Sequence, residues 1–263
     1  MSALAGYEDV GVSLEGPIAT VELRRPPNNF LDIDLIDHLA SVLEALDGES
    51  DCRAVVLAAA GKHFCAGANL GKRIEDEAAG KAVQRPRHLY QEARRLVATQ
   101  KPIVAAVHGA AIGAGLGLAL VADFRVTCKE ARLACNFAAL GYHPGFGMTV
   151  TLPRLVGHQR AKWLAYTGKR LPGDEAVAIG LADRLTEQSR VREVAHEMAS
   201  ELAQIAPLAL QATRESLNKD LVHEFRAATE REAFEQALLR ATNDFKEGVK
   251  ASSERRPAQF TGT

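Results

Sequence analysis

Apolar and polar residues alternate near the start of the chain in a pattern that predicts a β-hairpin. The segments VGVSLEG and PIATVELR, residues 10–16 and 17–24, meet at the turn-forming pair Glu15-Gly16. Apolar residues then recur at helical spacing until about Gly48, which predicts an amphipathic helix. The residues on its apolar face are Ile33, Ile36, Leu39, Leu43 and Leu46. A hairpin followed by a helix makes one ββα unit.

Uninterrupted apolar runs farther along the chain predict buried strands. The run RAVVLAAAG, residues 53–61, ends in a glycine turn. The run PIVAAVHG, residues 102–109, repeats this arrangement after a helical stretch near residues 86–99. Two further short strands are expected in FRVTC, residues 124–128, and ARLACN, residues 131–136. Strands that alternate with helices in this way predict an α/β core of repeated ββα-like units.

From about residue 147 onward the pattern becomes predominantly helical. One helical face is predicted by the spacing of Val191, Val194, Met198, Leu202 and Ile205. The polar tail SSERRPAQFTGT is expected either to fray or to be held by a neighbouring subunit. The sequence thus predicts a strand-rich first part and a helical C-terminal part.

The segment HGAAIGAGLGLALVAD, residues 108–123, contains four glycines and then runs apolar until an aspartate. Residues 103–122 are long enough to cross a bilayer as a helix. However, the run holds a histidine and four glycines, and no aromatic belt flanks it. A buried strand, a turn and a buried helix explain the same run, so we expect no membrane span.

The same glycines do not match a nucleotide-binding loop. Gly113, Gly115 and Gly117 form G-x-G-x-G, whereas a dinucleotide site needs G-x-G-x-x-G. Neither Asp123 nor Glu130 follows a second strand at the required spacing, and no Gly-Lys-Ser/Thr of a P-loop is present. What the pattern does predict is a glycine turn whose free N–H groups open a helix. Such a turn can hold an oxygen that becomes anionic during a reaction.

A second turn of this kind occurs in GKHFCAGANLGK, residues 61–72, directly after a predicted buried strand. Its small residues Ala66, Gly67 and Ala68 would allow a ligand to approach the backbone closely. Two turns with exposed amides, at the ends of neighbouring strands, could together surround one oxygen. That arrangement is the geometry of an oxyanion hole.

Composition limits the classes of partner. The chain has 263 residues with 32 basic and 33 acidic side chains, so its net charge of −1 draws it neither to nucleic acid nor to anionic lipid. The N-terminus lacks the pattern of a secretory signal. No Cys-x-x-Cys pair or zinc-ligand spacing occurs among Cys52, Cys65, Cys128 and Cys135. We therefore expect reduced thiols in a cytoplasmic protein without a metal site.

Several of these segments together resemble the crotonase (enoyl-CoA hydratase/isomerase) superfamily. The resemblance covers most of the chain and is strongest in the two turn motifs. It is carried by VELRRPPNNFLD, HFCAGANL, KPIVAAVHGAAIGAGLGLALVADFRV, LPRLVG, TGKRLPGDEAVAIGLADRL and EGVKASSERRPAQF.

The resemblance implies an α/β crotonase-like spiral of ββα units with a C-terminal helical trimerisation region. On this basis residues 1–200 form the core and residues 201–263 the helical oligomerisation region. The expected assembly is a homotrimer or a dimer of trimers. The implied substrate is an acyl-coenzyme A thioester, and no permanently bound cofactor is expected.

The resemblance also implies roles for residues of both turns. The backbone N–H groups of Ala68 and Ala114 would hold the thioester oxygen as an enolate develops. The carbonyl of Ala66 would meet the adenine of coenzyme A. Three cations lie near where the family engages coenzyme A phosphates, although they could equally be solvated surface residues: Arg24, Arg25 and Lys62.

The chain departs from the family pattern at the positions of both hydratase glutamates. An ungapped comparison of the motifs places Gly117 at the first and Phe137 at the second, and Asn69 replaces the usual aspartate of the first turn. Glycine and phenylalanine cannot transfer a proton, so hydration by two glutamates is not expected at these positions.

His143, in the segment GYHPGFG, is the first candidate for an acid or base, since a histidine titrates near neutrality. The alternative is a loop histidine bonded to nearby backbone. Tyr142 is a weaker candidate that could simply pack. His108 is expected to be structural, and His63 to face the coenzyme or solvent.

The remaining candidates lie outside the two turns. Asp123 matches a structural aspartate of the family. Residues 85–96, RPRHLYQEARRL, could contact phosphates or form a solvated helix face, from which Tyr90 or Glu92 could reach the acyl pocket.

The predicted function is therefore that of an acyl-CoA enzyme that stabilises a thioester enolate, of the hydratase (lyase) or isomerase type. Two alternatives remain open. One is a C–C bond hydrolase or decarboxylase of the same fold that uses His143. The other is a non-catalytic acyl-CoA-binding protein, which the loss of both glutamates would explain.

Overall fold

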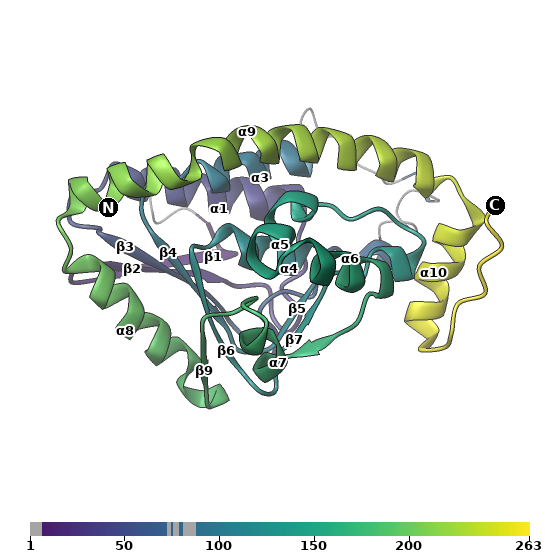
Figure 1. Cartoon of the computed structure of the whole chain (residues 1–263), viewed down its shortest axis with the longest axis horizontal. Helices are drawn as coiled ribbons and strands as arrows, with labels where there is room; N and C mark the ends of the chain where they lie inside the picture. Colours follow the sequence, from purple (N-terminus) through teal and green to yellow (C-terminus); the bar gives the residue numbers. More distant parts are fainter. Residues whose placement is uncertain (1–6, 73–74, 76–78, 81–87) are drawn as a thin grey trace.

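The computed structural model of the protein describes residues 7–72, 75, 79–80 and 88–263. Twisted strands occupy the middle of the molecule, and helices surround them (Figure 1). One long helix from the C-terminal part lies along a whole side of the molecule (Figure 1). The predicted α/β class is confirmed.

The larger sheet has the strand order β1-β2-β3-β4-β6-β9. The predicted hairpin pairs β1 with β2 in antiparallel fashion, and every other neighbouring pair is parallel. All residues of β3 are buried, as its continuous apolar run predicted. The strands are β1 (Val10–Glu15), β2 (Ile18–Leu23), β3 (Ala54–Ala59), β4 (Ile103–Val107), β6 (Phe124–Cys128) and β9 (Arg184–Thr186).

A smaller sheet contains β5 (Ala110–Ile112), β7 (Arg132–Ala134) and β8 (Leu171–Pro172). The strand β5 lies inside the glycine-rich run and was not predicted, because three residues between glycines give no readable alternation. An isolated parallel bridge joins Cys65 to Ala111 of β5. This bridge brings the first glycine turn alongside the second.

The predicted helices are present, with one correction. The first begins at the N-cap Asp32, whose side chain accepts a hydrogen bond from Leu35 N, and ends at Gly48. Ile205 was wrongly assigned to a helical face, because it lies beyond the end of its helix and is 51% exposed. The helices are α1 (Ile33–Asp47), α3 (Leu89–Val97), α4 (Ala114–Val121), α5 (Met148–Val156), α6 (His158–Thr167), α7 (Gly173–Ala178), α8 (Val191–Ala203), α9 (Pro207–Arg240) and α10 (Asn243–Glu254), with short 3-10 turns at η1 (Ala138–Leu140) and η2 (Gln188–Arg190).

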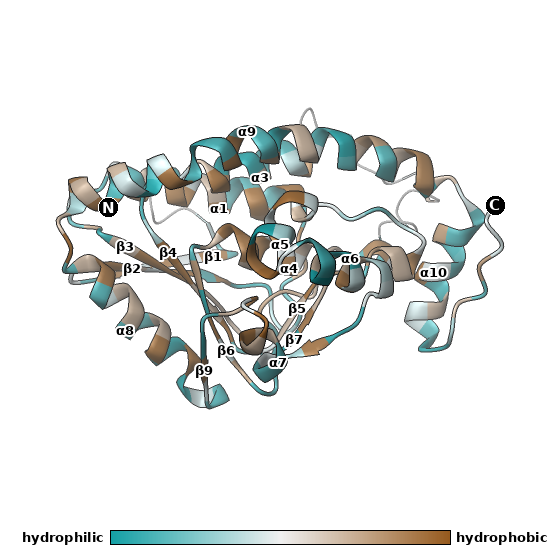
Figure 2. Ribbon diagram, in the orientation of Figure 1, coloured by the Kyte–Doolittle hydropathy of each residue, from teal (hydrophilic) through white to brown (hydrophobic). Residues whose placement is uncertain are grey.

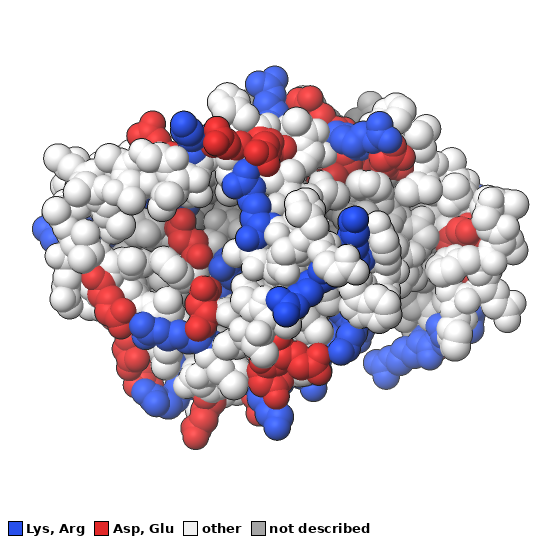
Figure 3. Space-filling view, in the orientation of Figure 1, with Lys and Arg blue, Asp and Glu red and all other residues white. Residues whose placement is uncertain are grey.

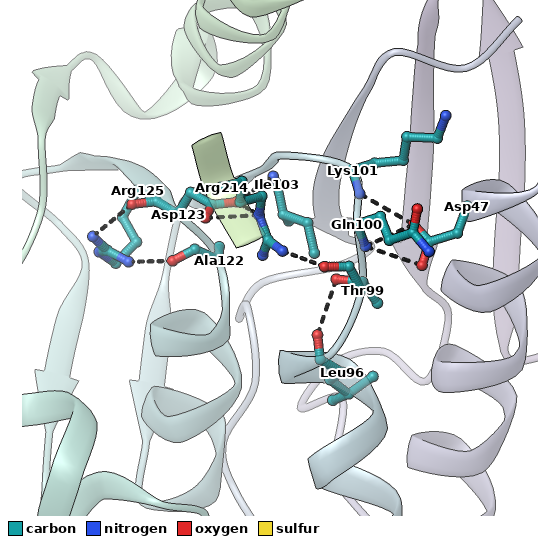
Figure 4. Close-up of polar contacts among 10 residues, drawn as sticks. All are labelled: Asp47, Leu96, Thr99, Gln100, Lys101, Ile103, Ala122, Asp123, Arg125 and Arg214. Carbon is teal, nitrogen blue, oxygen red and sulfur yellow. Dashed lines mark hydrogen bonds and ion pairs between the residues drawn. The ribbon is translucent and has the colours of Figure 1, made fainter. Parts of the chain in front are cut away.

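The long helix α9 packs against α3 and α5 of the same chain (Figure 1). A mostly buried ion pair holds it to the strands: Arg214 Nε donates to both carboxylate oxygens of Asp123, at 2.9 Å each. Arg214 also donates to Thr99 O, and Asp123 accepts from Ile103 N at 2.8 Å (Figure 4). Asp123 thus has the structural role expected of it. The predicted boundary at residue 200 falls inside α8.

The C-terminal tail is fixed to its own chain. Thr263 O accepts hydrogen bonds from Asn243 N at 2.7 Å and Asp244 N at 3.2 Å, at the start of α10. The Asp244 carboxylate accepts from Thr261 N and Gly262 N. The expectation of a frayed tail is therefore wrong, because α10 supplies the partners that a solvated tail would lack.

No helix in the described part of the chain combines the length and apolar character that crossing a membrane requires. The apolar run of residues 103–122 is divided among β4, β5 and α4. Figure 2 shows apolar residues concentrated in the central strands, whereas α9 carries a mixture. Figure 3 shows basic and acidic side chains interspersed over one face of the molecule, in keeping with the balanced composition.

Candidate active site

The two glycine-rich turns pack directly against each other. Cys65 N donates to Ala110 O at 2.9 Å, and Ile112 N donates to Cys65 O at 3.0 Å. A side chain at Gly67 would place its Cβ 2.5 Å from Ile112 O, and one at Gly115 would overlap with Cys65 O. Gly67 also has a φ of +83°. Glycine is therefore required at both positions for the turns to approach this closely.

This packing brings the predicted pair Ala68 and Ala114 together. A Cβ built on Gly67, the residue before Ala68, would lie 3.7 Å from Ala114 N. Ala114 is the first residue of α4, so its N–H has no partner within the helix. Within the described ranges, neither the Ala68 N–H nor the Ala114 N–H has an acceptor. Two free amides on adjacent turns, one at a helix N-terminus, suit a developing negative charge.

A buried asparagine, to which the sequence motifs gave no role, holds the first turn. Asn29 Nδ2 donates to Ala60 O and His63 O, both at 2.8 Å, and its Oδ1 accepts from Arg25 N. Its φ is +48°, a conformation that asparagine tolerates better than most residues. Two prolines followed by two asparagines, residues 26–29, were the available signal for such a turn.

Apolar groups fill the space beside the second turn. A Cβ at Gly117 would lie 2.6 Å from Phe146 Cβ, so the fully buried Phe146 lies directly against this glycine. The ring of Phe137 lies 3.7 Å from the Cβ position of Gly113, next to Ala114, and is also buried. The walls beside the second turn are therefore aromatic at these positions.

His143 lies half-buried in the loop of residues 141–147 that also carries Phe146. Its ring Nδ1 lies 2.7 Å from Pro144 O. Because a carbonyl can only accept, Nδ1 carries a proton, and a neutral ring presents Nε2 as a lone-pair acceptor. The expected backbone hydrogen bond of a loop histidine is present, and it also orients the ring.

Tyr142, the weaker candidate, packs away from the turns. Its buried ring lies 4.6 Å from that of Phe245 in α10. Tyr90 lies edge-on to Phe146 at 6.4 Å, and its hydroxyl donates to Gln236 Oε1 at 2.8 Å. Glu92 is buried and forms an ion pair with Arg95.

The predicted coenzyme-binding cations differ in their partners. Arg25 forms ion pairs with Asp9 at 2.6 Å and Asp32 at 2.5 Å. Arg24 pairs with Glu22 at 3.0 Å. Of the three cations, only Lys62 is without an ion-pair partner in the part of the chain that the structure describes, and it is exposed. Ala66, beside it in the first turn, is half-buried.

Two further histidines considered in the sequence, His63 and His108, lie at the first turn: His63 is part of it and His108 bonds its backbone. His108 Nε2 lies 3.0 Å from Gly61 O, to which it donates, in keeping with the structural role expected of it. Burial, together with the positive charge of Lys62, lowers the pKa of His63. Residues 85–87 of the predicted phosphate-contacting segment lie outside the described residues.

A buried carboxylate from α9 reaches the His143 loop, and no sequence motif indicated it. Glu232 is 0% exposed and accepts hydrogen bonds from Gly147 N at 2.7 Å, Thr149 N at 3.1 Å and Thr149 Oγ1 at 2.7 Å. Burial raises the pKa of Glu232. In the sequence it is one of many charged residues in a long helical stretch, so nothing distinguished it.

Comparison with known proteins agrees with this architecture. The family model of the enoyl-CoA hydratase/isomerase family matches residues 14–263. The short-chain-enoyl-CoA hydratase of Clostridium acetobutylicum is 33% identical over 251 residues, covering 92% of this chain and 93% of that protein. The 1,2-epoxyphenylacetyl-CoA isomerase of Escherichia coli is 31% identical over 257 residues, covering 95% and 97%. An enoyl-CoA hydratase/isomerase structure from Pseudoalteromonas atlantica T6c has a TM-score of 0.86 at 29% identity, covering 97% of this chain and 100% of that one.

The chain therefore belongs to the enoyl-CoA hydratase/isomerase family and has the crotonase fold, as the resemblance of its motifs predicted. It is an acyl-CoA-processing enzyme of the hydratase/isomerase type.

Proposed function

We propose that the protein binds an acyl-CoA thioester and stabilises its enolate with the backbone N–H groups of Ala68 and Ala114. The observation that carries this proposal is the pair of free amides on two turns that pack together through Gly67 and Gly115. When the α-carbon loses a proton or a substituent, negative charge moves to the thioester oxygen. Two fixed donors stabilise that charge without reorganising.

His143 is the proposed acid/base group of this reaction. Its Nδ1–H donates a hydrogen bond to Pro144 O, so Nε2 is the ring nitrogen that would accept a proton from the substrate and return it. Gly117 and Phe137 stand where the resemblance places the two hydratase glutamates, and Phe146 occupies the space beside Gly117. A single histidine with aromatic walls favours proton transfer at the α-carbon, as in isomerisation, over hydration by two carboxylates.

A C–C bond hydrolase or decarboxylase is the second candidate, and the same aromatic walls favour it. A substrate that carries a second carboxylate would meet no repelling negative charge at positions 117 and 137. Release of that carboxylate as CO2, or attack of water on a β-carbonyl group that then leaves as a carboxylic acid, leaves the electron pair of the broken C–C bond in the same enolate for Ala68 and Ala114 to stabilise. His143 would then protonate the α-carbon.

Coenzyme A is proposed to lie over the first turn. Lys62 is exposed and would contact a phosphate, and the carbonyl of Ala66 would accept a hydrogen bond from the adenine amino group. Arg24 and Arg25 are proposed as weaker contributors because each already pairs with a carboxylate. We propose no permanently bound cofactor and no metal.

The proposed assembly is a homotrimer or a dimer of trimers. Large apolar side chains are exposed on α6 and on the last turns of α9: Trp163 is 65%, Tyr166 72%, Phe234 58% and Leu238 55% exposed. Exposed apolar side chains of this size are suited to an interface. Light scattering coupled to size-exclusion chromatography measures the assembly directly, and a monomer at micromolar concentration would contradict this proposal. The four buried, free cysteines support a cytoplasmic location.

A substrate panel with matched variants tests the proposed reaction. The panel contains crotonyl-CoA, a β-ketoacyl-CoA and a malonyl-type CoA thioester. We expect His143→Ala to lower kcat on the best substrate by about 10²–10⁴-fold, the usual contribution of a general acid or base. Binding of the thioester should persist, because the two amides are unchanged. His158→Ala is the control, since His158 is an exposed histidine at the start of α6.

Three results would change the proposal. Hydration of crotonyl-CoA at ordinary hydratase rates would show that the residues at positions 117 and 137 do not limit the reaction. Unchanged turnover in His143→Ala would remove His143 from the mechanism. Binding of the thioesters without turnover of any of them would favour a non-catalytic acyl-CoA-binding protein.

A further inference from the structure

Two buried polar side chains of α9, one helical turn apart, hold the loop that carries His143. Glu232 accepts hydrogen bonds from Gly147 N, Thr149 N and Thr149 Oγ1. Gln236 Nε2 donates to His143 O at 2.8 Å. Residues four apart on a helix share one face, so the two side chains reach the two ends of this loop together.

The loop fits closely against α9 and α3. A Cβ at Gly145 would overlap with the hydroxyl of Tyr90 and lie 2.6 Å from Gln236 Nε2. A Cβ at Gly147 would overlap with the ring of Phe225, also from α9. The loop backbone therefore lies in direct contact with α9, with no room for intervening side chains.

The backbone of this loop needs external support. Phe146 and Gly147 have φ values of +62° and +70°, and for a phenylalanine this conformation is unfavourable. Both Gly147 N and Thr149 N donate hydrogen bonds to the Glu232 carboxylate. A fully buried carboxylate is tolerated only where such donors surround it. The carboxylate and the strained segment therefore depend on each other.

We propose that Glu232 and Gln236 are positioning residues for His143, and this rests on the acid/base role proposed for His143 above. Gln236 fixes the backbone of His143, and the Nδ1–H hydrogen bond to Pro144 O fixes the ring relative to that backbone. Glu232 fixes the segment that follows and, with it, the Phe146 ring beside Gly117. The direction of His143 Nε2 is thus set by a helix that contributes no reacting group.

The test is a double-mutant cycle on the full-length protein with the thioester that turns over fastest. Gln236→Leu keeps most of the side-chain volume and removes the hydrogen bond to His143 O, together with the one accepted from the Tyr90 hydroxyl. We expect kcat to fall by about 10- to 100-fold, because misplacing a catalytic group by about 1 Å has effects of this size. KM should change by less than about 3-fold, since the coenzyme contacts are untouched. In the His143→Ala background, Gln236→Leu should lower kcat by less than about 2-fold.

Thr229→Val is the matched control. Thr229 is a buried polar residue of α9 that accepts a hydrogen bond from Arg94 on α3, and among the described residues its hydroxyl forms no hydrogen bond with the loop. It should lose a comparable amount of thermal stability but retain kcat. Glu232→Gln, a second isosteric variant, places an NH2 group against N–H donors and should lower kcat at least as much as Gln236→Leu.

The outcomes separate this inference from the proposed function. An equal loss of kcat from Gln236→Leu in both backgrounds would overturn positioning through His143 and assign Gln236 a general structural role. The same conclusion would follow if Thr229→Val lowered kcat as much as Gln236→Leu did. A His143→Ala variant with unchanged kcat would instead overturn the proposed function, and the positioning role with it.

Discussion

The two halves of the candidate site are built in opposite ways. In the paired turns, residues 61–72 and 108–117, two backbone amides come close together because Gly67 and Gly115 have no side chain. In the loop of residues 141–147, which carries His143, side chains of α9 hold the backbone through hydrogen bonds, and α9 follows much later in the chain. In the first half the proposed donors are backbone amides of two turns that meet through backbone contacts, and the Asn29 side chain holds one turn. In the second half side chains of α9 hold the loop.

This difference explains how the two halves can change independently. An oxyanion hole of backbone amides is retained as long as the close-approach glycines are retained, whatever side chains surround it. The proposed acid/base group, His143, lies on a loop that side chains of α9 hold, so substitutions in α9 can alter its conformation. Conserving the first half while changing the second would alter the reaction without altering the fold.

The largest expected effect follows from adding a single methyl group to the paired turns. Gly67→Ala would place a Cβ 2.5 Å from Ile112 O and would strain a φ of +83°. Because the turns must then separate, we expect kcat/KM to fall by about 10²–10³-fold, as when one oxyanion donor is removed. Steady-state kinetics on the best thioester measures this.

Gly16→Ala is the control for that prediction, since Gly16 also has a positive φ but no atom lies within 4 Å of its Cβ position. The Gly16→Ala variant therefore has the strain of an alanine at positive φ but no steric overlap of its Cβ with a neighbouring atom. Equal losses of activity in the two variants would show that the close approach of the turns is unimportant.

The next effect concerns the ion pair that anchors α9, the helix that holds the second half. Arg214→Met removes the partner of Asp123 and should cost about 3 kcal/mol in the free energy of unfolding, measured by urea denaturation. Arg226→Ala, which breaks an exposed pair with Glu230, should cost less than about 0.5 kcal/mol. If the two variants were equally stable, α9 would not be held by the Asp123 pair.

A smaller effect is expected where the two halves meet, at Gly117 and Phe146. Gly117→Ala should destabilise the protein by about 1–3 kcal/mol, because its Cβ would lie 2.6 Å from Phe146 Cβ. In a Phe146→Gly background that cost should largely disappear, which gives a coupling energy of about 1–2 kcal/mol by urea denaturation. Additive costs would show that the two residues do not share one space. For the same reason, Gly117→Glu alone should not increase hydration of crotonyl-CoA.

The smallest effect is local, at the end of α10 and the C-terminal tail, and depends on pH. The Arg256 guanidinium and the Gln259 N–H lower the pKa of Glu247 to about 2 from its usual 4.5. A carboxylate with a lowered pKa stabilises the folded state fully above pH 4.5, and that stabilisation is lost as the pH falls toward 2. Hydrogen-exchange protection of the Gln259 amide should fall over this range while catalysis at neutral pH is unaffected. In Glu247→Gln, that protection should be low at every pH.

Much of the first half could be predicted from the sequence. The hairpin, the buried strands and the amphipathic helix follow from local periodicity, and the small residues of both turns indicate close backbone approach. The pairing of Ala68 with Ala114 needed one further step, the resemblance of two motifs to a family. The short strand β5, which aligns the turns, was missed because three residues carry no periodic signal.

The second half was decided by tertiary structure. His143 was identifiable as a titratable residue in a glycine loop, but its partners come from α9, 85 residues away for Glu232–Gly147 and 93 for Gln236–His143. The helix carries polar residues around most of its surface, so no apolar stripe indicates which of them become buried (Figure 2). The sequence indicated the two turns because glycines and other small residues mark each of them locally. Only folding determined which side chains hold His143, because burial and partners are properties of contacts between distant segments.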